Sequence, residues 1–308
     1  MSPTVSVLMN CYNGEKYLRE AIDSVYAQSF TDWEIILWDD ASKDGTESIA
    51  RSYDEKLRYF KGSKAVSLGQ ARNWAIEKAK GEFIAFLDQD DIWLPQKLEQ
   101  QITLFQTDPE IGIVISDGYS FNDNKAIVNQ FHPKKKPPTG FVFSELIRRY
   151  FIPMPAAIIR RKAFDGLSYG FDERFTQLEE TDLFDRIAYT WKLGYVDKCL
   201  VKWRMHKESW TFSQPSSYPQ EMRLMLDNYA KIFDDFNSRY AKEVRYANAM
   251  IDVFLSMNDL NNGRNAEARK RLFPHFKHGY KFIFLYLLCF LPPRIYRLTQ
   301  RLRGQSPP

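Results

Sequence analysis

The sequence predicts an α/β protein with a mostly parallel central sheet flanked by helices. Short apolar runs alternate with amphipathic segments through the first hundred residues, and the apolar runs end in polar clusters. Strands and helices that alternate at such short intervals favour a parallel sheet covered on both faces. Sheets of this kind bind ligands at the carboxyl ends of their strands. We therefore expect a ligand site where the polar clusters meet.

The predicted elements follow from the spacing of apolar residues. Runs of four to six apolar residues indicate buried strands, and apolar residues three and four apart indicate helices. A glycine, Gly81, closes the helix before the fourth strand. Strands are expected at residues 5–10, 33–38, 57–60, 83–87, 111–115, 156–159 and 201–206, and helices at 15–28, 68–80, 96–106 and 184–192.

The composition is that of an ordinary globular protein. The chain has 308 residues, of which 44% are hydrophobic, and its formal net charge is only +4. This small charge gives no indication of a nucleic-acid partner. The three cysteines lie far apart in the sequence, without zinc spacing or a disulfide framework, which fits a reducing cytosol. We also expect no signal peptide at the start of the sequence.

The strongest chemical signal is the acidic cluster that follows residues 83–87. Asp88 and Asp90 are two positions apart, so an extended chain projects both to the same side. Such carboxylates repel one another unless a cation neutralises them. Oxygen ligands favour Mg²⁺ or Mn²⁺, and Mg²⁺ commonly bridges carboxylates and substrate phosphates. The alternative is a solvated turn in which Asp91 caps the following helix.

The last third of the chain has a different character. We expect a boundary near residue 216, a helical extension over 217–263 and a basic amphipathic tail over 264–308. The apolar stretch 280–291 is too short to cross a bilayer unaided, and arginines alternate with apolar residues over 294–303. The tail therefore predicts attachment to an anionic membrane surface. Alternatively, it packs on protein, within the chain or in a homodimer.

Several motifs, in their proper order, resemble the family 2 glycosyltransferases. The resemblance covers roughly residues 4 to 210, so the last third of the chain lies outside it. Its motifs are Tyr12-Asn13-Gly14, Asp39-Asp40-Ala41-Ser42-Lys43-Asp44-Gly45-Thr46, Gly69-Gln70-Ala71-Arg72-Asn73, Asp88-Gln89-Asp90-Asp91, Phe171-Asp172-Glu173-Arg174-Phe175 and Glu179-Glu180-Thr181-Asp182-Leu183.

The resemblance implies a GT-A fold over residues 1–216. A nucleotide-sugar-binding part would cover about 1–118 and an acceptor part about 119–216. It also implies an inverting transfer of a sugar from a nucleotide-diphosphate donor, with UDP or dTDP favoured, assisted by Mg²⁺ or Mn²⁺. A glycan or lipid-linked hydroxyl would be the acceptor, in surface-polysaccharide assembly on the cytoplasmic face of the inner membrane.

The matching positions give the expected site residues. Asp40 falls where a carboxylate binds the nucleobase, and Arg72 where a side chain faces the donor. Asp88 and Asp90 are the acids of the DxD motif, with Asp90 the first choice as metal ligand and Asp88 near the ribose or the metal. Asp91 is expected to be a helix cap or a group that supports the ligands. The residues expected to line the nucleoside pocket are Asn10, Tyr12 and Asn13.

The acceptor side of the site is expected at two further glutamates. The family's general base is the second acid of a Glu-Asp pair, and that position is Glu180 here, so Glu replaces the usual Asp. Glu179 is the alternative base or an acceptor contact. His206, in a segment that follows the acceptor half, is expected near the diphosphate and the metal.

Two other functions are considered. A catalytically inactive relative would bind a sugar nucleotide and act as a scaffold in a membrane complex, but the acids at Asp40, Asp88, Asp90 and Glu180 argue against it. A nicotinamide dehydrogenase would need a Gly-x-Gly-x-x-Gly turn after the first strand. The residues there are Asn10-Cys11-Tyr12-Asn13-Gly14, so this class is discounted.

Overall fold

The computed structural model describes residues 2–124, 126–206 and 217–290. The chain forms two compact units, Met1–His206 and Lys207–Pro308, and each is described here by itself. The boundary expected near residue 216 and the arginine-rich segment 294–303 lie outside the described residues.

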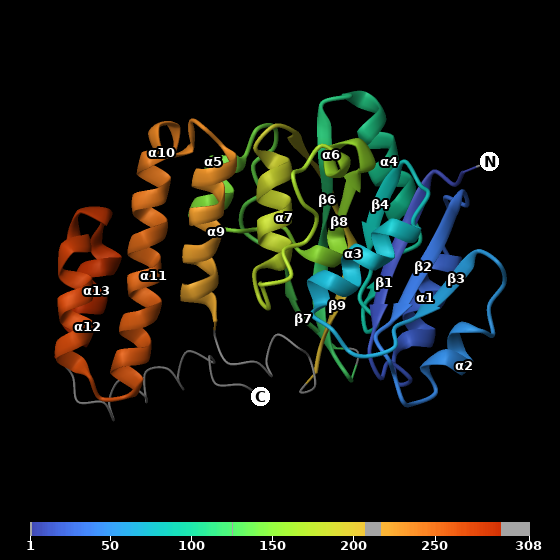
Figure 1. Ribbon diagram of the computed structural model, residues 1–308, viewed down its shortest axis with the longest axis horizontal. Coiled ribbons are helices and arrows are strands. Elements are labelled where there is room, and N and C mark those ends of the chain that lie inside the picture. Colours follow the sequence, from blue (N-terminus) through green and yellow to red (C-terminus); the bar gives the residue numbers. More distant parts are fainter. Residues whose placement is uncertain (1, 125, 207–216, 291–308) are drawn as a thin grey trace. The chain divides into compact units, whose positions relative to one another are not determined.

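The first unit is built around a nine-stranded sheet (Figure 1). The strand order is β3-β2-β1-β4-β8-β6-β9-β5, and β7 pairs with β6 outside this path. The strands are β1 (Val5–Cys11), β2 (Trp33–Asp39), β3 (Leu57–Lys61), β4 (Phe83–Phe86), β5 (Ile92–Trp93), β6 (Ile111–Asn122), β7 (Ile127–Gln130), β8 (Ala157–Arg160) and β9 (Lys192–Met205).

The sheet is parallel in its first part and mixed in its second. Strands β3, β2, β1 and β4 run parallel, as expected from the alternating pattern. Strand β8 then inserts between β4 and β6 and runs antiparallel to both, while β6 and β9 are parallel. The apolar run of β8 predicts a buried strand, but its direction depends on the irregular segment before it, which carries no periodic signal.

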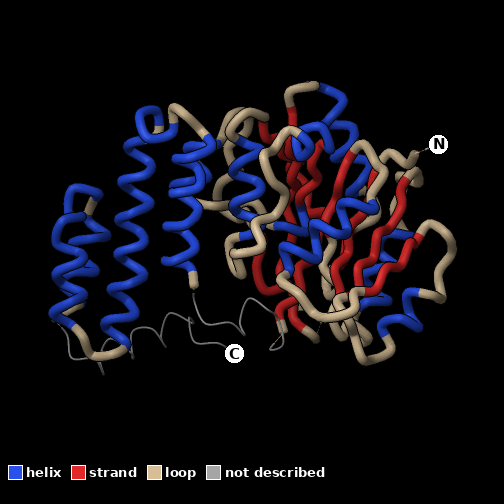
Figure 2. Tube along the Cα trace, viewed as in Figure 1, coloured by secondary structure: helices blue, strands red, loops and turns tan. Residues whose placement is uncertain are grey.

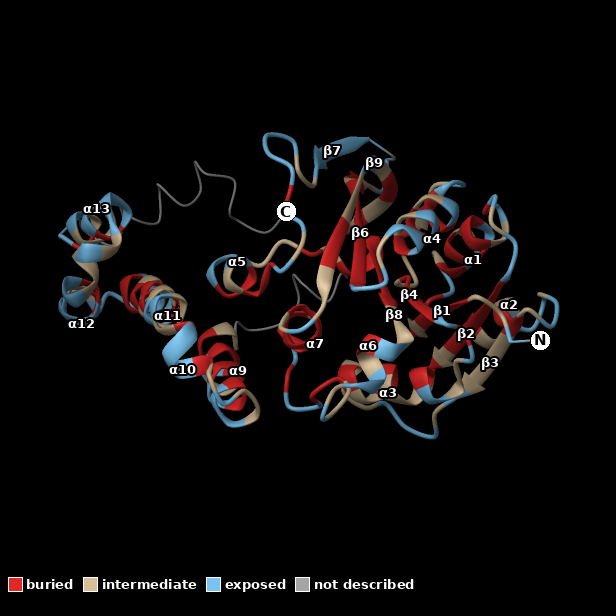
Figure 3. Ribbon diagram, turned by 90° about the horizontal axis from the view of Figure 1, so that it is seen from above, coloured by how far each residue is buried: buried red, intermediate tan, exposed pale blue. Residues whose placement is uncertain are grey.

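Helices cover both faces of this sheet (Figure 3). Helices α1 and α4 lie on one face, and α3, α6 and α7 lie on the other, each face having its own apolar core. The helices of this unit are α1 (Leu18–Tyr26), α2 (Thr46–Ala50), α3 (Leu68–Lys78), α4 (Lys97–Thr107), α5 (Phe143–Arg148), the 3₁₀ helix η1 (Met154–Ala156), α6 (Arg161–Asp165) and α7 (Glu179–Ala188).

The sheet register brings the polar strand ends together. In the β1–β2 pair, Cys11 lies opposite Asp39, and in the β1–β4 pair, Leu8 lies opposite Phe86. The residues after β1, β2 and β4 therefore leave the same edge of the sheet, as the sequence predicts.

The second unit is helical throughout its described part (Figure 2). Alanines and leucines of α11 and α12 pack with Phe282 and Cys289 into a small apolar core. No helix among the described residues is long and apolar enough to cross a membrane. The helices are α9 (Tyr218–Ile232), α10 (Phe236–Arg239), α11 (Ala241–Asn261), α12 (Asn265–Leu272), the 3₁₀ helix η2 (Phe273–His278) and α13 (Tyr280–Leu288).

Candidate active site

The loops after β1 and β2 are tied to each other by hydrogen bonds. The backbone N–H of Asn13 donates to Ser42 Oγ at 2.8 Å, and Lys43 N–H donates to Asn13 Oδ1 at 3.0 Å. Gly14 N–H donates to Thr46 Oγ1 at 2.9 Å. Asn13 has a φ of 51°, in the left-handed region that Asn adopts more readily than most residues. The amide oxygen of Asn13 thus helps to build the loop, a role that the resemblance does not indicate.

Asp39 and Asp40 have different surroundings although they are adjacent. Asp39 is fully buried and accepts hydrogen bonds from Ser42 N–H at 2.8 Å and from the Tyr59 hydroxyl at 2.5 Å. Asp40 is half-buried and, among the described residues, accepts the backbone N–H of Val66, at 3.0 Å from Oδ2. Burial raises the pKa of the Asp40 carboxyl. Asp39 therefore holds the loop, while Asp40 presents its carboxylate at the sheet edge.

The end of β1 is linked to the acidic loop after β4. Tyr12 N–H donates to Gln89 Oε1 at 2.9 Å, and Gln89 Nε2 donates to Tyr12 O at 3.4 Å. A side chain at Gly14 would place its Cβ 2.4 Å from Cys11 Sγ, so only glycine allows this approach. The Tyr12 side chain is 50% exposed, and the buried Asn10 Nδ2 has no hydrogen-bond partner in the described chain. Both side chains are therefore available to a ligand at this edge.

The three acids after β4 have separate partners. His206 Nε2 lies 2.8 Å from Asp90 Oδ2, which brings together two of the expected metal ligands. Asp91 is fully buried, and its Oδ1 accepts the backbone N–H of Arg204 at 2.8 Å. Burial, followed by the charges of Asp90 and Asp88, raises the pKa of Asp91 well above its ordinary value. The expectation that Asp91 caps the next helix is wrong, because α4 begins after Gln96 and Asp91 instead fixes β9.

Arg204 fixes the acidic loop from the side of β9. Its Nε donates to the carbonyl oxygen of Asp90 at 2.8 Å, and its Nη2 lies 2.5 Å from Glu20 Oε2. The guanidinium lies between the rings of Tyr17 and Phe121, 4.5 Å from each centroid, a cation–π arrangement. This role of Arg204 was not predicted, since its partners are distant in the chain and no motif marks the position.

Arg72 joins the two acidic motifs. This side chain on α3 is buried, and its Nη2 lies 3.4 Å from Asp88 Oδ1 while its Nη1 lies 3.0 Å from Glu179 Oε1. Although burial works against the charged form, the carboxylates around it raise the pKa of Arg72. The guanidinium therefore remains charged and holds the acidic loop after β4 and the first turn of α7 at one place.

Glu180 follows in the same helical turn but has a different partner. The hydroxyl of Tyr150 donates to Glu180 Oε1 at 3.4 Å, and Glu180 forms no ion pair within the described chain. Burial, and then the negative charge of Glu179, raise the pKa of Glu180 to about 8. Burial and the nearby acids also raise the pKa of Tyr150, so its hydroxyl keeps its proton. Tyr150 lies between the motifs, where an aromatic residue looks like any other core residue. Its contact with Glu180 was therefore not predicted.

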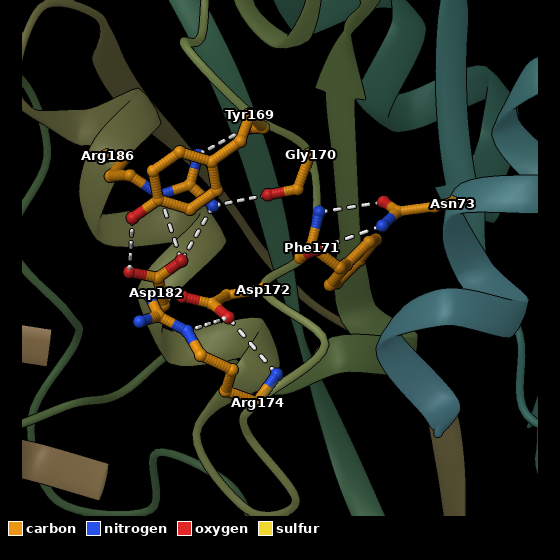
Figure 4. A network of polar contacts seen from close by, with 8 residues as sticks. All are labelled: Asn73, Tyr169, Gly170, Phe171, Asp172, Arg174, Asp182 and Arg186. Atoms are coloured by element: carbon orange, nitrogen blue, oxygen red, sulfur yellow. Dashed lines mark hydrogen bonds and ion pairs between the residues drawn. The ribbon is translucent and has the colours of Figure 1, made fainter. Parts of the chain in front are cut away.

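A buried polar network fixes the segment that precedes these glutamates (Figure 4). The guanidinium of Arg186 donates to Asp182 Oδ2 at 2.9 and 2.7 Å and to the carbonyl oxygens of Tyr169 and Gly170. Phe171 exchanges two hydrogen bonds with the Asn73 side chain, at 2.8 and 2.9 Å. Asn73 follows Arg72 on α3, so one turn of α3 holds both this segment and Glu179. Removing one partner of such a buried pair leaves an uncompensated charge.

The donor set fits a divalent cation that is completed by a substrate. Carboxylates from Asp88 and Asp90, with the imidazole of His206, match the ligands that Mn²⁺ accepts, and the carboxylates match Mg²⁺. In the chain as described, however, no three His, Cys, Asp or Glu side chains are grouped so as to hold a metal. Mg²⁺ bound through one or two carboxylates and substrate phosphates needs no such protein cage.

Comparison with known proteins identifies the family of the chain. The model of the family "Glycosyl transferase family 2" matches residues 6–167. The chain is 30% identical to a glycosyltransferase of Rickettsia felis over 232 residues, which make up 74% of this chain but only 38% of that longer protein. It is 31% identical to the Escherichia coli UDP-Glc:alpha-D-GlcNAc-diphosphoundecaprenol beta-1,3-glucosyltransferase WfgD, over 54% of this chain and 64% of that protein.

A solved structure confirms the fold. TarS of S. aureus, residues 1–349 in complex with UDP-GlcNAc, matches with a TM-score of 0.69 at 20% identity, over 97% of this chain and 92% of that chain. The α/β sheet with flanking helices is therefore the GT-A fold. The family model spans more than half of the chain, and the expectation from the motifs is confirmed: this protein belongs to glycosyl transferase family 2.

Proposed function

We propose that this protein is an inverting, metal-dependent hexosyltransferase. It moves a sugar from a UDP- or dTDP-sugar to a hydroxyl of a glycan or lipid-linked acceptor. The observation that carries this proposal is the position of Arg72, which contacts an acid of the DxD motif at 3.4 Å and an acid of the α7 pair at 3.0 Å. One buried guanidinium therefore holds an acid proposed for donor binding beside Glu179, the neighbour of the proposed base Glu180.

The nucleotide is bound at the edge formed by the ends of β1, β2 and β4. Asp40 accepts an N–H of the base, and the half-exposed Tyr12 and the amide of Asn10 contact the nucleoside, while Asn13 shapes the loop. Asp90, Asp88 and His206 hold Mg²⁺ or Mn²⁺ together with the diphosphate. The cation, when bound, stabilises the negative charge of the departing diphosphate.

Glu180 is the general base, and Glu179 is not. Glu179 is paired with the buried Arg72 at 3.0 Å, so its carboxylate is engaged by a guanidinium and not by an acceptor. Glu180 has a pKa of about 8, close to the value at which a base both ionises and accepts a proton near neutral pH. Glu180 has one methylene more than Asp, and its Oε1 lies 3.4 Å from the Tyr150 hydroxyl.

The transfer is a single displacement. The Glu180 carboxylate takes the proton of the acceptor hydroxyl as the acceptor oxygen forms its bond to the anomeric carbon. The bond from that carbon to the diphosphate oxygen breaks, and its electron pair leaves with the diphosphate. The acceptor enters on the face opposite the leaving group, so the configuration at the anomeric carbon is inverted.

A membrane-bound acceptor is the favoured class. The name of WfgD describes a diphosphoundecaprenol-linked acceptor, and this relative supports a lipid-linked sugar as the acceptor here. We place the protein on the cytoplasmic face of the membrane, in the assembly of a surface polysaccharide.

Turnover of purified full-length protein with a panel of nucleotide sugars tests the proposal. We expect release of UDP or dTDP only with Mg²⁺ or Mn²⁺ present, loss of release on chelation, and a product of inverted anomeric configuration by NMR. A protein that binds the nucleotide sugar without turnover, with every acceptor supplied, would instead be the inactive scaffold.

A further inference from the structure

Helix α13 exposes a stripe of large apolar side chains. Tyr280, Ile283, Phe284 and Leu287 are 79%, 43%, 48% and 58% exposed. Their spacing of three, four and seven residues places them on one side of the helix. Monomeric proteins rarely leave so many large apolar side chains in contact with water over one contiguous surface.

The opposite side of α13 is already used for packing. Phe282 and Cys289 are buried, and Leu285 and Tyr286 pack against the same core, which contains α11 and α12 residues. The apolar side chains of α13 therefore have two different environments, which the apolar sequence alone does not indicate. One side fixes the helix within the helical unit, and this packing directs the α13 stripe, defined as Tyr280, Ile283, Phe284 and Leu287, toward the outside.

The surroundings of the stripe are basic. From residue 264 to 290 the chain carries six Lys and Arg residues and one acid, Glu267. Arg264 and Arg271 are paired with Asp259 of α11, so the lysines carry most of the unpaired positive charge of this segment. Lys277, three residues before Tyr280, and Lys281, directly after it, are exposed. The apolar rings of Phe273 and Phe290 are 63% and 59% exposed. Aromatic and aliphatic side chains beside lysines form the combination that anionic lipid surfaces bind.

We propose that the α13 stripe docks this protein on an anionic lipid bilayer, with the helix lying in the plane of the interface. A helix of nine residues is about 14 Å long, less than half the thickness of the hydrocarbon core, so it can lie in the surface but not cross it. This inference rests on the proposed function only in that a lipid-linked acceptor requires the enzyme at a membrane.

A second copy of the chain is a less suitable occupant. Stable protein interfaces bury about 800 Å² on each partner, with some 20 residues or more. The stripe has four residues, and a symmetric contact would bring the same basic surface of two chains together. An anionic bilayer offers head groups that pair with the lysines and an acyl region that buries the apolar side chains.

Vesicle flotation of the full-length protein provides the test. The vesicles contain phosphatidylcholine with about 30% phosphatidylglycerol, or phosphatidylcholine alone. We expect binding to the anionic vesicles, and a loss of about tenfold or more in the variant Ile283→Ser/Phe284→Ser/Leu287→Ser. The charge variant Lys277→Gln/Lys281→Gln should lose binding to anionic vesicles by a smaller factor, and added salt should reduce that difference.

A matched control removes exposed apolar residues from the other unit. Ile127 and Val128 on β7 are 59% and 45% exposed, and Ile127→Ser/Val128→Ser should bind vesicles as the wild type does. Circular dichroism confirms that each variant is folded. Unchanged vesicle binding by the triple α13 variant would overturn the proposal. A wild-type dimer that the same variant converts to a monomer, without vesicle binding, would overturn it in favour of self-association.

The test separates this inference from the proposed function. Asp90→Ala should bind vesicles normally, because lipid docking does not involve the donor site. The triple α13 variant should turn over nucleotide sugar normally with a water-soluble acceptor. Vesicle binding by a protein that transfers no sugar would support the docking surface and contradict only the enzymatic proposal.

Discussion

The two acid pairs of the site resemble one another in composition but differ in environment. Asp88 and Asp90 follow a strand, while Glu179 and Glu180 begin a helix. In each pair one acid contacts Arg72, and these two are Asp88 and Glu179. The second acid of each pair has a different neighbour: His206 lies 2.8 Å from Asp90, and Tyr150 lies 3.4 Å from Glu180.

Under the proposed function, this difference lets one group of residues serve two kinds of chemistry. An acid beside an imidazole, at the exposed edge of a sheet, suits the binding of a cation and phosphates. An acid beside a neutral phenol, in a buried helical turn, has a raised pKa and suits proton transfer. The single arginine neutralises the remaining acid of each pair. The following predictions test this division, from the largest expected effect to the smallest.

Asp90→Ala should remove nearly all transfer. The variant loses the acid that we assign to the cation, so charge on the departing diphosphate is no longer stabilised, and we expect kcat to fall by about 10³-fold or more. Initial rates of nucleotide release at several Mn²⁺ concentrations measure this. Glu55→Ala, at an exposed acid in the same unit, serves as the control. An Asp90→Ala enzyme with wild-type activity would contradict the metal role.

Glu180→Gln should lower kcat by about 10²- to 10⁴-fold, since the amide cannot accept the acceptor proton. Donor affinity, measured by calorimetry, should stay near the wild-type value. Glu179→Gln should instead weaken the contact with Arg72 and so disturb donor binding as well as rate. If Glu179→Gln lowers only kcat, and Glu180→Gln changes kcat little, then Glu179 is the base and Glu180 is not.

The pH dependence follows from the same carboxyl. The base must be ionised, and its pKa is raised to about 8, so kcat/KM should rise from pH 6 to about pH 8 and then level off. A folded-state pKa above the ordinary value means that ionisation of Glu180 costs stability, beginning above the unfolded pKa and increasing to about pH 8. Glu180→Gln should therefore melt at a higher temperature than the wild type at pH 8, and this difference should vanish near pH 4. A lower Tm for the variant at pH 8 would contradict the raised pKa.

Tyr150→Phe should have the smallest of these effects. Loss of a hydrogen bond to a charged group is worth about 1 to 2 kcal/mol, which corresponds to a decrease of roughly five- to thirtyfold at neutral pH. The hydroxyl stabilises the ionised form of Glu180, so the rising limb of the pH profile should move to higher pH. Tyr195→Phe, which removes a hydroxyl 3.3 Å from Asp117, is the matched control. A uniform loss at all pH values would indicate a structural role for Tyr150.

The sequence predicted local features of this site better than its long-range contacts. The polar ends of β1, β2 and β4 were identified because strand periodicity and parallel topology together determine where those ends meet. The contact of Arg72 with both Asp88 and Glu179 was not predicted. Glu179 is 107 residues away from Arg72, and nothing in either motif specifies the partner. The antiparallel β8 and the role of Asp91 were missed for a similar reason, since both depend on strands that pair across large sequence separations.

The clamp between the loops after β1 and β2 also bears on how donor preference is changed. Asn13, Ser42 and Thr46 connect these loops through hydrogen bonds of 2.8 to 3.0 Å. The two loops therefore behave as one structural unit, although more than 25 residues separate them in the chain. Grafting either loop alone from a relative with another nucleotide preference should break the clamp and lose donor binding. Both loops, transferred together, form the smallest exchangeable unit for altering the nucleobase that this enzyme accepts.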